Sequence, residues 1–382
     1  MAIPLLISTG CPAIAESPAA GAPSAPLAAA QDGCAAPAPV CAARDGVFSI
    51  GAYAPYGSAV RIGPDLLVTN RHVVADEKTV ELTLPDGTAI PGEVLPTSYG
   101  GDLVLVKAAL PEGPALVPGT VEKGGDVYTV AQDITERRVR VFEKGHVLLT
   151  PAPDRPFARL HHTAYSQPGN SGGALVNAKG ELVAIATSGG EGRFEAVPAT
   201  EFAELREETG ADREAESGRI GRAYRECSDI VLQAIRVADR LPADIAEKMS
   251  ASCEASRNRQ LLDLAAQAFG RSRDFDKAIE FFQKALERDP NAINTRLSLV
   301  ITLNFARRRD EALPHVRWLL DVIPEDAAVQ RAAVQAGKFS GDKELAGRAL
   351  KLIEQHNPQQ LEAAKRFLEA PLPPALRDQQ KQ

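Results

Sequence analysis

The sequence contains no uninterrupted apolar stretch of the ~18 residues that a membrane-spanning helix requires, so no transmembrane segment is expected. It has no C-x-x-C pair among its 5 cysteines, which argues against a structural zinc site, and no motif implies an organic cofactor. Positive charge is also scarce, because 43 Lys and Arg against 50 Asp and Glu give a net charge of −7. This balance disfavours nucleic acid and anionic membrane surfaces as partners.

Basic residues are missing at the N-terminus as well. Residues 2–10 are a short apolar stretch, and residues 13–15 have the A-x-A pattern of a signal-peptide cleavage site. We interpret residues 1–15 as a truncated signal peptide and expect export to the bacterial periplasm, with a cytoplasmic protein as the alternative. Ala and Pro dominate residues 16–45, which predicts a disordered tether, since such a segment buries too little side chain to offset its ordering entropy.

All cysteines except the first lie beyond that cleavage site, and their even number suits an oxidising compartment. Cys227 and Cys253 lie in two helical patterns, at nearly equal distances from a turn at residues 241–242. An antiparallel helix hairpin places such residues side by side, which predicts a Cys227–Cys253 disulfide. Cys34 and Cys41 are the candidates for a second disulfide. Two buried thiols in a cytosolic protein are the alternative for the first pair.

The two halves of the chain differ in their hydrophobic period. Residues 46–205 form short alternating runs, such as residues 79–84, separated by turn signals such as Pro85-Asp86-Gly87. Many short strands at this spacing predict a β-sandwich or a β-barrel. Helical periodicity begins beyond this region, after a polar stretch at residues 206–218 that predicts a linker.

The helical half repeats with a period of 34 residues. Three prolines and three alanines follow this period: Pro290, Pro324, Pro358, Ala278, Ala312 and Ala346. A period of this length with two helices per unit is typical of tetratricopeptide repeats, and the first unit resembles that family closely. The sequence therefore predicts an α-solenoid at residues 219–377. Its expected parts are repeats at about 259–292, 293–326 and 327–360 and a capping helix at 361–377.

Three segments of the first half carry the residues of one chemistry. They are TNRHVV at residues 69–74, GDLVLV at 101–106 and QPGNSGG at 167–173. In this order they resemble the trypsin-like serine proteases, and especially the bacterial HtrA/Deg branch, over about 160 residues. The resemblance implies a double six-stranded β-barrel protease domain at residues 46–205, followed here by the α-solenoid where HtrA proteins usually carry PDZ modules. The activation and assembly of HtrA proteins therefore do not transfer to this chain.

The resemblance also assigns the catalytic residues. Ser171 is the expected nucleophile, His72 the general base and then acid, and Asp102 the residue that orients the imidazole. The backbone N–H groups of Gly169 and Ser171 are expected to form the oxyanion hole. The peptide bond would then be cleaved through an acyl-enzyme on Ser171.

The same resemblance places the substrate pocket. Tyr165 stands at the expected base of the primary specificity pocket, and Thr187, Ser188 and Gly189 match the strand that lines it. A tyrosine at the base argues against selection of Lys or Arg, so a small or medium apolar P1 residue is expected. The neighbouring residues 161–162 are both histidines, but no Cys, Asp or Glu nearby completes a metal site, and we interpret them as strand residues.

Other functions remain open at the level of sequence. The G-x-S-x-G pattern around Ser171 also fits an α/β-hydrolase, but that fold needs a helix after the serine and a later catalytic histidine. The only later histidines are His315 and His356, within the repeats. The main prediction is a serine endopeptidase whose repeats recruit a protein partner or a protein or peptide substrate. The alternatives are a catalytically silent scaffold whose repeats bind proteins, and a cytosolic protease switched by a partner on the repeats.

Overall fold

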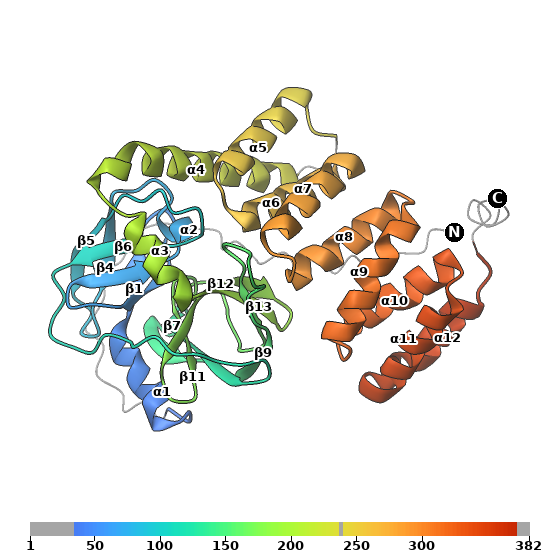
Figure 1. The fold of residues 1–382 in the computed structure, drawn as a ribbon, viewed down its shortest axis with the longest axis horizontal. Coiled ribbons are helices and arrows are strands. Elements are labelled where there is room, and N and C mark those ends of the chain that lie inside the picture. The colour runs from blue at the N-terminus through green and yellow to red at the C-terminus, as the bar shows by residue number, and fades with distance from the viewer. Residues whose placement is uncertain (1–33, 237–239, 373–382) are drawn as a thin grey trace. The chain divides into compact units, whose positions relative to one another are not determined.

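The computed structural model describes residues 34–236 and 240–372, so the expected signal peptide at residues 1–15 lies outside the described residues. The described chain forms two compact units (Figure 1). The first unit contains the chain up to Glu226 together with Glu254–Asn258, and the second contains Cys227–Cys253 and the residues from Arg259 onward.

The first unit begins with a closed six-stranded antiparallel barrel. On β4 the exposed Thr79, Glu81 and Thr83 alternate with the buried Val80 and Leu82, as a strand with one face on a core requires. The hydrogen-bonded order around the barrel is β1-β2-β3-β6-β5-β4. The strands are β1 (Val47–Gly51), β2 (Gly57–Arg61), β3 (Leu66–Thr69), β4 (Thr79–Thr83), β5 (Ala89–Val94) and β6 (Val104–Ala108).

A second barrel follows in the same unit. Its ring runs β7-β9-β10-β13-β12-β11 and closes through the pairing of β11 with β7, while β8 extends β7 as a hairpin. The strands are β7 (Asp126–Asp133), β8 (Arg138–Val141), β9 (Gly145–Leu149), β10 (Leu160–His162), β11 (Ala174–Asn177), β12 (Leu182–Gly190) and β13 (Arg193–Pro198). The double six-stranded β-barrel expected from the sequence is confirmed (Figure 1).

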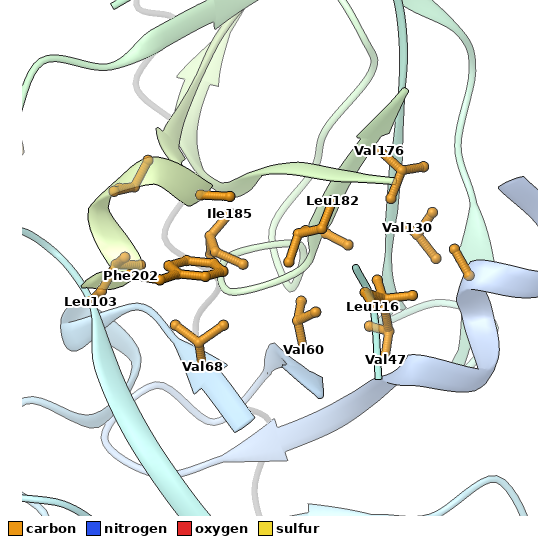
Figure 2. Close-up of a cluster of buried hydrophobic side chains, with 14 of the residues drawn as sticks. Val47, Val60, Val68, Leu103, Leu116, Val130, Val176, Leu182, Ile185 and Phe202 are labelled. Carbon is orange, nitrogen blue, oxygen red and sulfur yellow. The ribbon is translucent and has the colours of Figure 1, made fainter. Parts of the chain in front are cut away.

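The two barrels pack together through one cluster of buried apolar side chains (Figure 2). Val60 on β2 and Val68 on β3 lie opposite Leu182 and Ile185 on β12, and Phe202 of α3 (Phe202–Glu207) closes one end. Burial of each such side chain contributes about 1.5–3 kcal/mol relative to exposure. The cluster therefore fixes the barrels against each other, and residues from both can build one site.

Residues 34–45 are ordered, which corrects the expectation of a disordered tether at 16–45 for this part of it. They contain α1 (Ala38–Ala42) and the start of the 3-10 helix η1 (Ala43–Gly46), and a disulfide joins Cys34 to Cys41. Val40 and the first residue of η1 are buried in the cluster between the barrels. Burial of these residues and the short disulfide loop together offset the ordering entropy of the segment. Its Ala- and Pro-rich composition gave no indication of either feature.

Helix α4 (Glu214–Arg236) begins inside the stretch expected as a linker at residues 206–218. That stretch holds the end of α3, the short helix η3 (Ala211–Arg213) and the first turn of α4. Glu214 in this first turn pairs with Lys78, which directly precedes β4. Further along α4, Arg225 pairs at 2.6 Å with Asp76 and at 2.7 Å with Glu77, on the chain just after α2 (Arg71–Val74). At least one charge of the expected linker is therefore a partner of the first barrel.

The second unit is a run of helices that pack as consecutive hairpins, α6 with α7, α8 with α9 and α10 with α11 (Figure 1). The first helices of these hairpins begin at residues 259, 293 and 327 and the second at 275, 309 and 343, which reproduces the period of 34 residues. A disulfide between Cys227 and Cys253 joins α4 to α5. The bounds are α5 (Ala243–Ala255), α6 (Arg259–Arg271), α7 (Phe275–Arg288), α8 (Ile293–Phe305), α9 (Arg309–Val322), α10 (Ala327–Ser340), α11 (Lys343–His356) and α12 (Leu361–Glu369).

Helix α12 begins where the capping helix was expected, and residues 373–377 of that expected helix lie outside the described residues. In the described part of the chain, none of the helices combines the length and the apolar character needed to cross a bilayer.

Candidate active site

The half-buried His72 and the buried Asp102 form a hydrogen-bonded pair at the edge of the first barrel. His72 lies in α2, directly after β3, and Asp102 precedes β6, which pairs with β3. One carboxylate oxygen of Asp102 lies 2.7 Å from His72 Nδ1, and the other accepts the backbone N–H of His72 at 3.0 Å. With Nδ1–H donated to the carboxylate, Nε2 is left as the proton acceptor of the ring.

The environment of Asp102 keeps its carboxylate ionised. Burial alone would raise the pKa of Asp102, because its side chain is only 2% exposed. The charge and the hydrogen bond of His72, together with the charge of Arg159, outweigh this effect and hold the pKa of Asp102 below its ordinary value. An ionised carboxylate at this position can stabilise the imidazolium that forms when His72 takes a proton.

Ser171 lies in the loop between β10 and β11. Its hydroxyl donates a hydrogen bond to the backbone carbonyl oxygen of Thr187 on β12 at 3.1 Å. Among the described residues, Thr187 is the partner of this hydroxyl and His72 is not. The Ser171 hydroxyl is therefore turned toward β12, and hydrogen bonds between a candidate nucleophile and its base often form only when substrate is bound.

Residues of both barrels hold the loop that carries Ser171. The backbone N–H of Ser58 on β2 donates to the carbonyl oxygen of Ser171 at 2.7 Å, and the Ser58 hydroxyl donates to that of Gly169 at 3.0 Å. The side-chain amide of Asn170 donates to the carbonyl oxygen of Gln132 on β7 at 2.8 Å. The backbone N–H of Gln132 in turn donates to the Ser58 hydroxyl at 2.9 Å, which completes the network.

Two glycines make this loop possible. Gly169 and Gly172 have φ values of 94° and 84°, in a region that other residues rarely adopt. A Cβ on Gly172 would lie 1.9 Å from the carbonyl oxygen of Ser58. In the described part of the chain, the backbone N–H groups of Gly169 and Ser171 have no hydrogen-bond acceptor. Unpaired donors beside a nucleophile are what an oxyanion hole requires.

A cavity of about 390 Å³ lies beside this loop. Tyr165 and Phe194 form its aromatic wall, with ring centroids 6.2 Å apart. Of the expected pocket residues, Tyr165 lines this cavity, whereas the segment from Thr187 to Gly189 does not. The lining residues are Glu143, Lys144, Thr163, Tyr165, Ser166, Gly190, Glu191, Gly192 and Phe194.

Arg159 is a buried cation beside Asp102 that the sequence analysis missed. Its Nη2 lies 3.7 Å from the carboxylate of Asp102, and its Nη1 lies 3.0 Å from Glu195 Oε2 on β13 and donates to Ser188 Oγ at 2.9 Å. The sequence offered only an arginine before a short strand, and arginines are rarely buried without a partner. Its partner stands 36 residues away, so no local pattern could reveal the pair.

The histidine pair of β10 is buried and does not form part of a metal cluster. His162 stacks on Phe194 with ring centroids 5.9 Å apart. Its burial, and secondarily the charge of His161, lower the pKa of His162 to about 3, so it is neutral at physiological pH. Across residues 34–236 and 240–372, no group of three or more His, Cys, Asp or Glu side chains is placed to hold a metal ion.

Part of the chain is similar to known peptidases. Residues 57–185 match the trypsin-like peptidase domain family. The matched residues span most of both barrels and include His72, Asp102 and Ser171, so the first unit is similar to a trypsin-like peptidase domain. Curated proteins of similar sequence include the serine endoprotease DegS and the serine protease HTRA1A of Danio rerio, in agreement with the HtrA/Deg branch that the sequence motifs resemble.

Two curated relatives define the extent of the similarity. The putative serine protease HhoA of Synechocystis is 30% identical over 134 residues, which are 32% of this chain and 34% of HhoA. The serine endoprotease DegS of Escherichia coli is 30% identical over 131 residues, which are 32% of this chain and 36% of DegS. The chain thus spans about a third of the length of the curated relatives it matches.

Solved structures resemble part of the chain. The crystal structure of the Rv3671c protease in an inactive form is 20% identical, with a TM-score of 0.41, and covers 47% of this chain and 99% of that one. The HtrA-type protease AlgW with a tripeptide is 25% identical, with a TM-score of 0.39, and covers 44% of this chain and 60% of that one.

Proposed function

We propose that the first unit is a serine endopeptidase that cleaves peptide bonds with Ser171, His72 and Asp102. The observation that carries the proposal is the buried, ionised Asp102 held at 2.7 Å from His72 Nδ1. This contact occupies Nδ1 of His72 and leaves Nε2 as the proton acceptor. Ser171, whose proton Nε2 would accept, lies in a loop that residues of both barrels hold.

The reaction begins when the Ser171 hydroxyl leaves the Thr187 carbonyl and turns to His72. Nε2 of His72 takes the hydroxyl proton while Oγ attacks the carbonyl carbon of the scissile peptide bond. The N–H groups of Gly169 and Ser171 stabilise the negative oxygen of the tetrahedral intermediate. His72 then gives its proton to the leaving amine, and a water molecule activated by the same histidine hydrolyses the acyl-enzyme.

The aromatic cavity favours an apolar substrate residue. Tyr165 and Phe194 present ring surface, and we assign the cavity of about 390 Å³ to the P1 side chain. Thr187, Ser188 and Gly189 belong to β12, and the edge of this strand would pair with the substrate backbone. Its place beside the Ser171 loop supports this role, since the hydroxyl already touches Thr187.

The second unit would bind the protein partner or substrate. The 34-residue spacing of its helix starts supports tetratricopeptide-like repeats, which stack into a solenoid with an extended concave surface. Two disulfides, Cys34–Cys41 and Cys227–Cys253, support an oxidising compartment, and one relative is described as a probable periplasmic endoprotease of Chlamydia pneumoniae. We therefore favour export to the periplasm.

Labelling with a fluorophosphonate probe tests the proposed activity. The wild-type chain should be labelled, and Ser171→Ala should not. Ser250→Ala is the matched control, because the Ser250 hydroxyl also donates to a backbone carbonyl, that of Ala246 at 2.8 Å, and it should be labelled like the wild type. A folded wild type that stays unlabelled would reject the peptidase and favour the silent scaffold, in which the repeats carry the function.

A further inference from the structure

We propose that Arg159 is a positioning residue for the catalytic pair, and that Glu195 balances its charge so that Asp102 remains available to His72. The proposal rests on the proposed peptidase function. It adds a second buried ion pair behind the site, and this pair sets how strongly the imidazolium of His72 is stabilised.

The geometry places one cation between two anions in the interior of the first unit. Arg159 lies 3.7 Å from the carboxylate of Asp102 and 3.0 Å from that of Glu195. The side chains of Arg159 and Glu195 are each 4% exposed, and that of Asp102 is 2% exposed. Water screens charges poorly at such depth, so each charge acts on its neighbours more strongly than it would at the surface.

The contact of Arg159 with Asp102 is electrostatic rather than a hydrogen bond. A separation of 3.7 Å exceeds the range of N–H···O bonds, whereas both carboxylate oxygens of Asp102 already bond to His72. Arg159 therefore does not replace His72 as a partner. It adds positive charge next to the carboxylate that must later neutralise the imidazolium.

Glu195 and Ser188 determine how strongly the positive charge of Arg159 acts on Asp102. Arg159 Nη1 donates to Ser188 Oγ at 2.9 Å, and the Ser188 hydroxyl donates to Glu195 Oε2 at 3.2 Å. The guanidinium is thus drawn toward β12 and β13. Ser188 directly follows Thr187, whose carbonyl holds Ser171, so the same ion pair also supports the strand assigned to the substrate.

A purely structural role would not require these charges. Two apolar side chains of similar volume commonly fill such a space with equal or greater stability, because burying an ion pair carries a desolvation penalty. An electrostatic role predicts a different result. Loss of the Arg159 cation and loss of the Glu195 anion should then move the pH midpoint of labelling in opposite directions.

Other titratable groups near Arg159 and Glu195 could also affect a pH profile of labelling. His161 on β10 lies opposite Glu195 in the strand register. Burial lowers the pKa of Arg71 to about 10, and it raises the pKa values of Tyr99 and Tyr224. These three groups keep one charge state between pH 5 and 8, and the control experiment therefore replaces His161, the histidine that faces Glu195 across the strands.

The experiment follows the rate of fluorophosphonate labelling against pH in the full chain. Glu195→Gln removes the nearer of the two anions beside Arg159, which should slow labelling about tenfold and move the acid-side midpoint down by about one pH unit. Arg159→Met should move that midpoint up. The double variant Arg159→Met/Glu195→Gln removes both charges and should return the midpoint close to that of the wild type. Each variant is repeated with His161→Asn, and the shifts should persist.

Two results would overturn the inference while leaving the peptidase intact. One is a slower rate with an unchanged midpoint in all variants, and the other is a shift in the same direction for both single variants. If Arg159→Met fails to fold, Arg159→Lys is used, which keeps the cation and should keep the wild-type midpoint even at a reduced rate. Loss of the wild-type midpoint in a folded Arg159→Lys would overturn the inference, and an unlabelled wild type would overturn the peptidase proposal with it.

Discussion

The backbone N–H of Ser58 on β2 donates to the carbonyl oxygen of Ser171 at 2.7 Å, and this bond ties the loop of the second barrel to a strand of the first. The Ser58 hydroxyl adds a second bond, to Gly169, and receives a third from Gln132. One serine on β2 thus fixes both ends of the segment whose N–H groups would bind the oxyanion. The first barrel contributes this support in addition to His72 and Asp102.

Gly172→Ala should disrupt that support. The new Cβ would lie 1.9 Å from the carbonyl oxygen of Ser58, and φ at this residue is 84°. We expect loss of labelling and a decrease of about 2–4 kcal/mol in the free energy of unfolding, measured in urea by circular dichroism. The control is Gly87→Ala, with φ of 87° and nothing within 4 Å, which should cost only about 1 kcal/mol. Equal effects of the two substitutions would contradict the steric argument.

Asp102→Asn should change both activity and the pH dependence of stability. The folded state lowers the pKa of Asp102, so its ionised form stabilises the fold above the unfolded pKa of about 3.9, and this contribution is lost as the pH falls below that value. Unfolding free energy should therefore decline less on acidification from pH 5 to pH 2 in Asp102→Asn than in the wild type. Labelling should fall by orders of magnitude, because an amide favours the wrong imidazole tautomer.

The exposed Asp86 provides the comparison for this measurement. Its pKa is also lowered, through hydrogen bonds from Thr88 in the β4–β5 hairpin, but it lies in solvent. Asp86→Asn should leave labelling unchanged and alter the acid decline only slightly. A decline in Asp102→Asn as steep as that of the wild type would show that Asp102 is not ionised in the folded state.

Gly221→Ala should weaken the first unit although alanine favours helices. Gly221 lies in the half of α4 that packs on the first barrel, and a Cβ there would lie 2.5 Å from the carbonyl oxygen of Ala75. We expect a loss of about 1–3 kcal/mol in unfolding free energy and slower labelling, since the displaced segment follows His72. Gly218→Ala on the same helix meets only the end of the Arg222 side chain at 3.1 Å and should stabilise by up to about 1 kcal/mol.

Removal of the Cys227–Cys253 disulfide should destabilise the second unit. The bond closes a segment with a sequence separation of 26, for which the chain-entropy relation gives about 3.5 kcal/mol. Cys227→Ser/Cys253→Ser should lower the unfolding free energy by an amount of this order relative to the oxidised wild type, and a reductant should remove most of the difference. Cys34→Ser/Cys41→Ser, with a separation of 7, should have a smaller effect. A wild type that is insensitive to a reductant in urea would count against the prediction.

The sequence was most informative where a function depends on adjacent residues. The segments around His72, Asp102 and Ser171 are each short, and alternation along strands such as β4 predicted the barrels. These patterns involve residues that are close in the sequence, so they can be recognised without knowledge of the fold. The period of 34 residues predicted the helix starts of the second unit for the same reason.

The parts that could not be predicted depend on partners distant in sequence. Arg159 and Glu195 are ordinary charged residues until the pairing of β10 and β13 brings them together in the interior. The charged start of α4 resembled a linker, because Lys78, the partner of Glu214, lies 136 residues earlier in the chain. Composition likewise concealed Val40, whose burial depends on contacts between the barrels.

The network around Ser58 also bears on how the cell makes this protein. A chain emerging from the ribosome exposes His72 and Asp102 first and Ser171 later, but Thr187 and its strand come last. A nascent chain that ends before β12 lacks some of the bonds that shape the loop, since those bonds join β2, β7 and β12. Under the proposed function, such a chain therefore carries His72, Asp102 and Ser171 before their loop can be organised for cleavage.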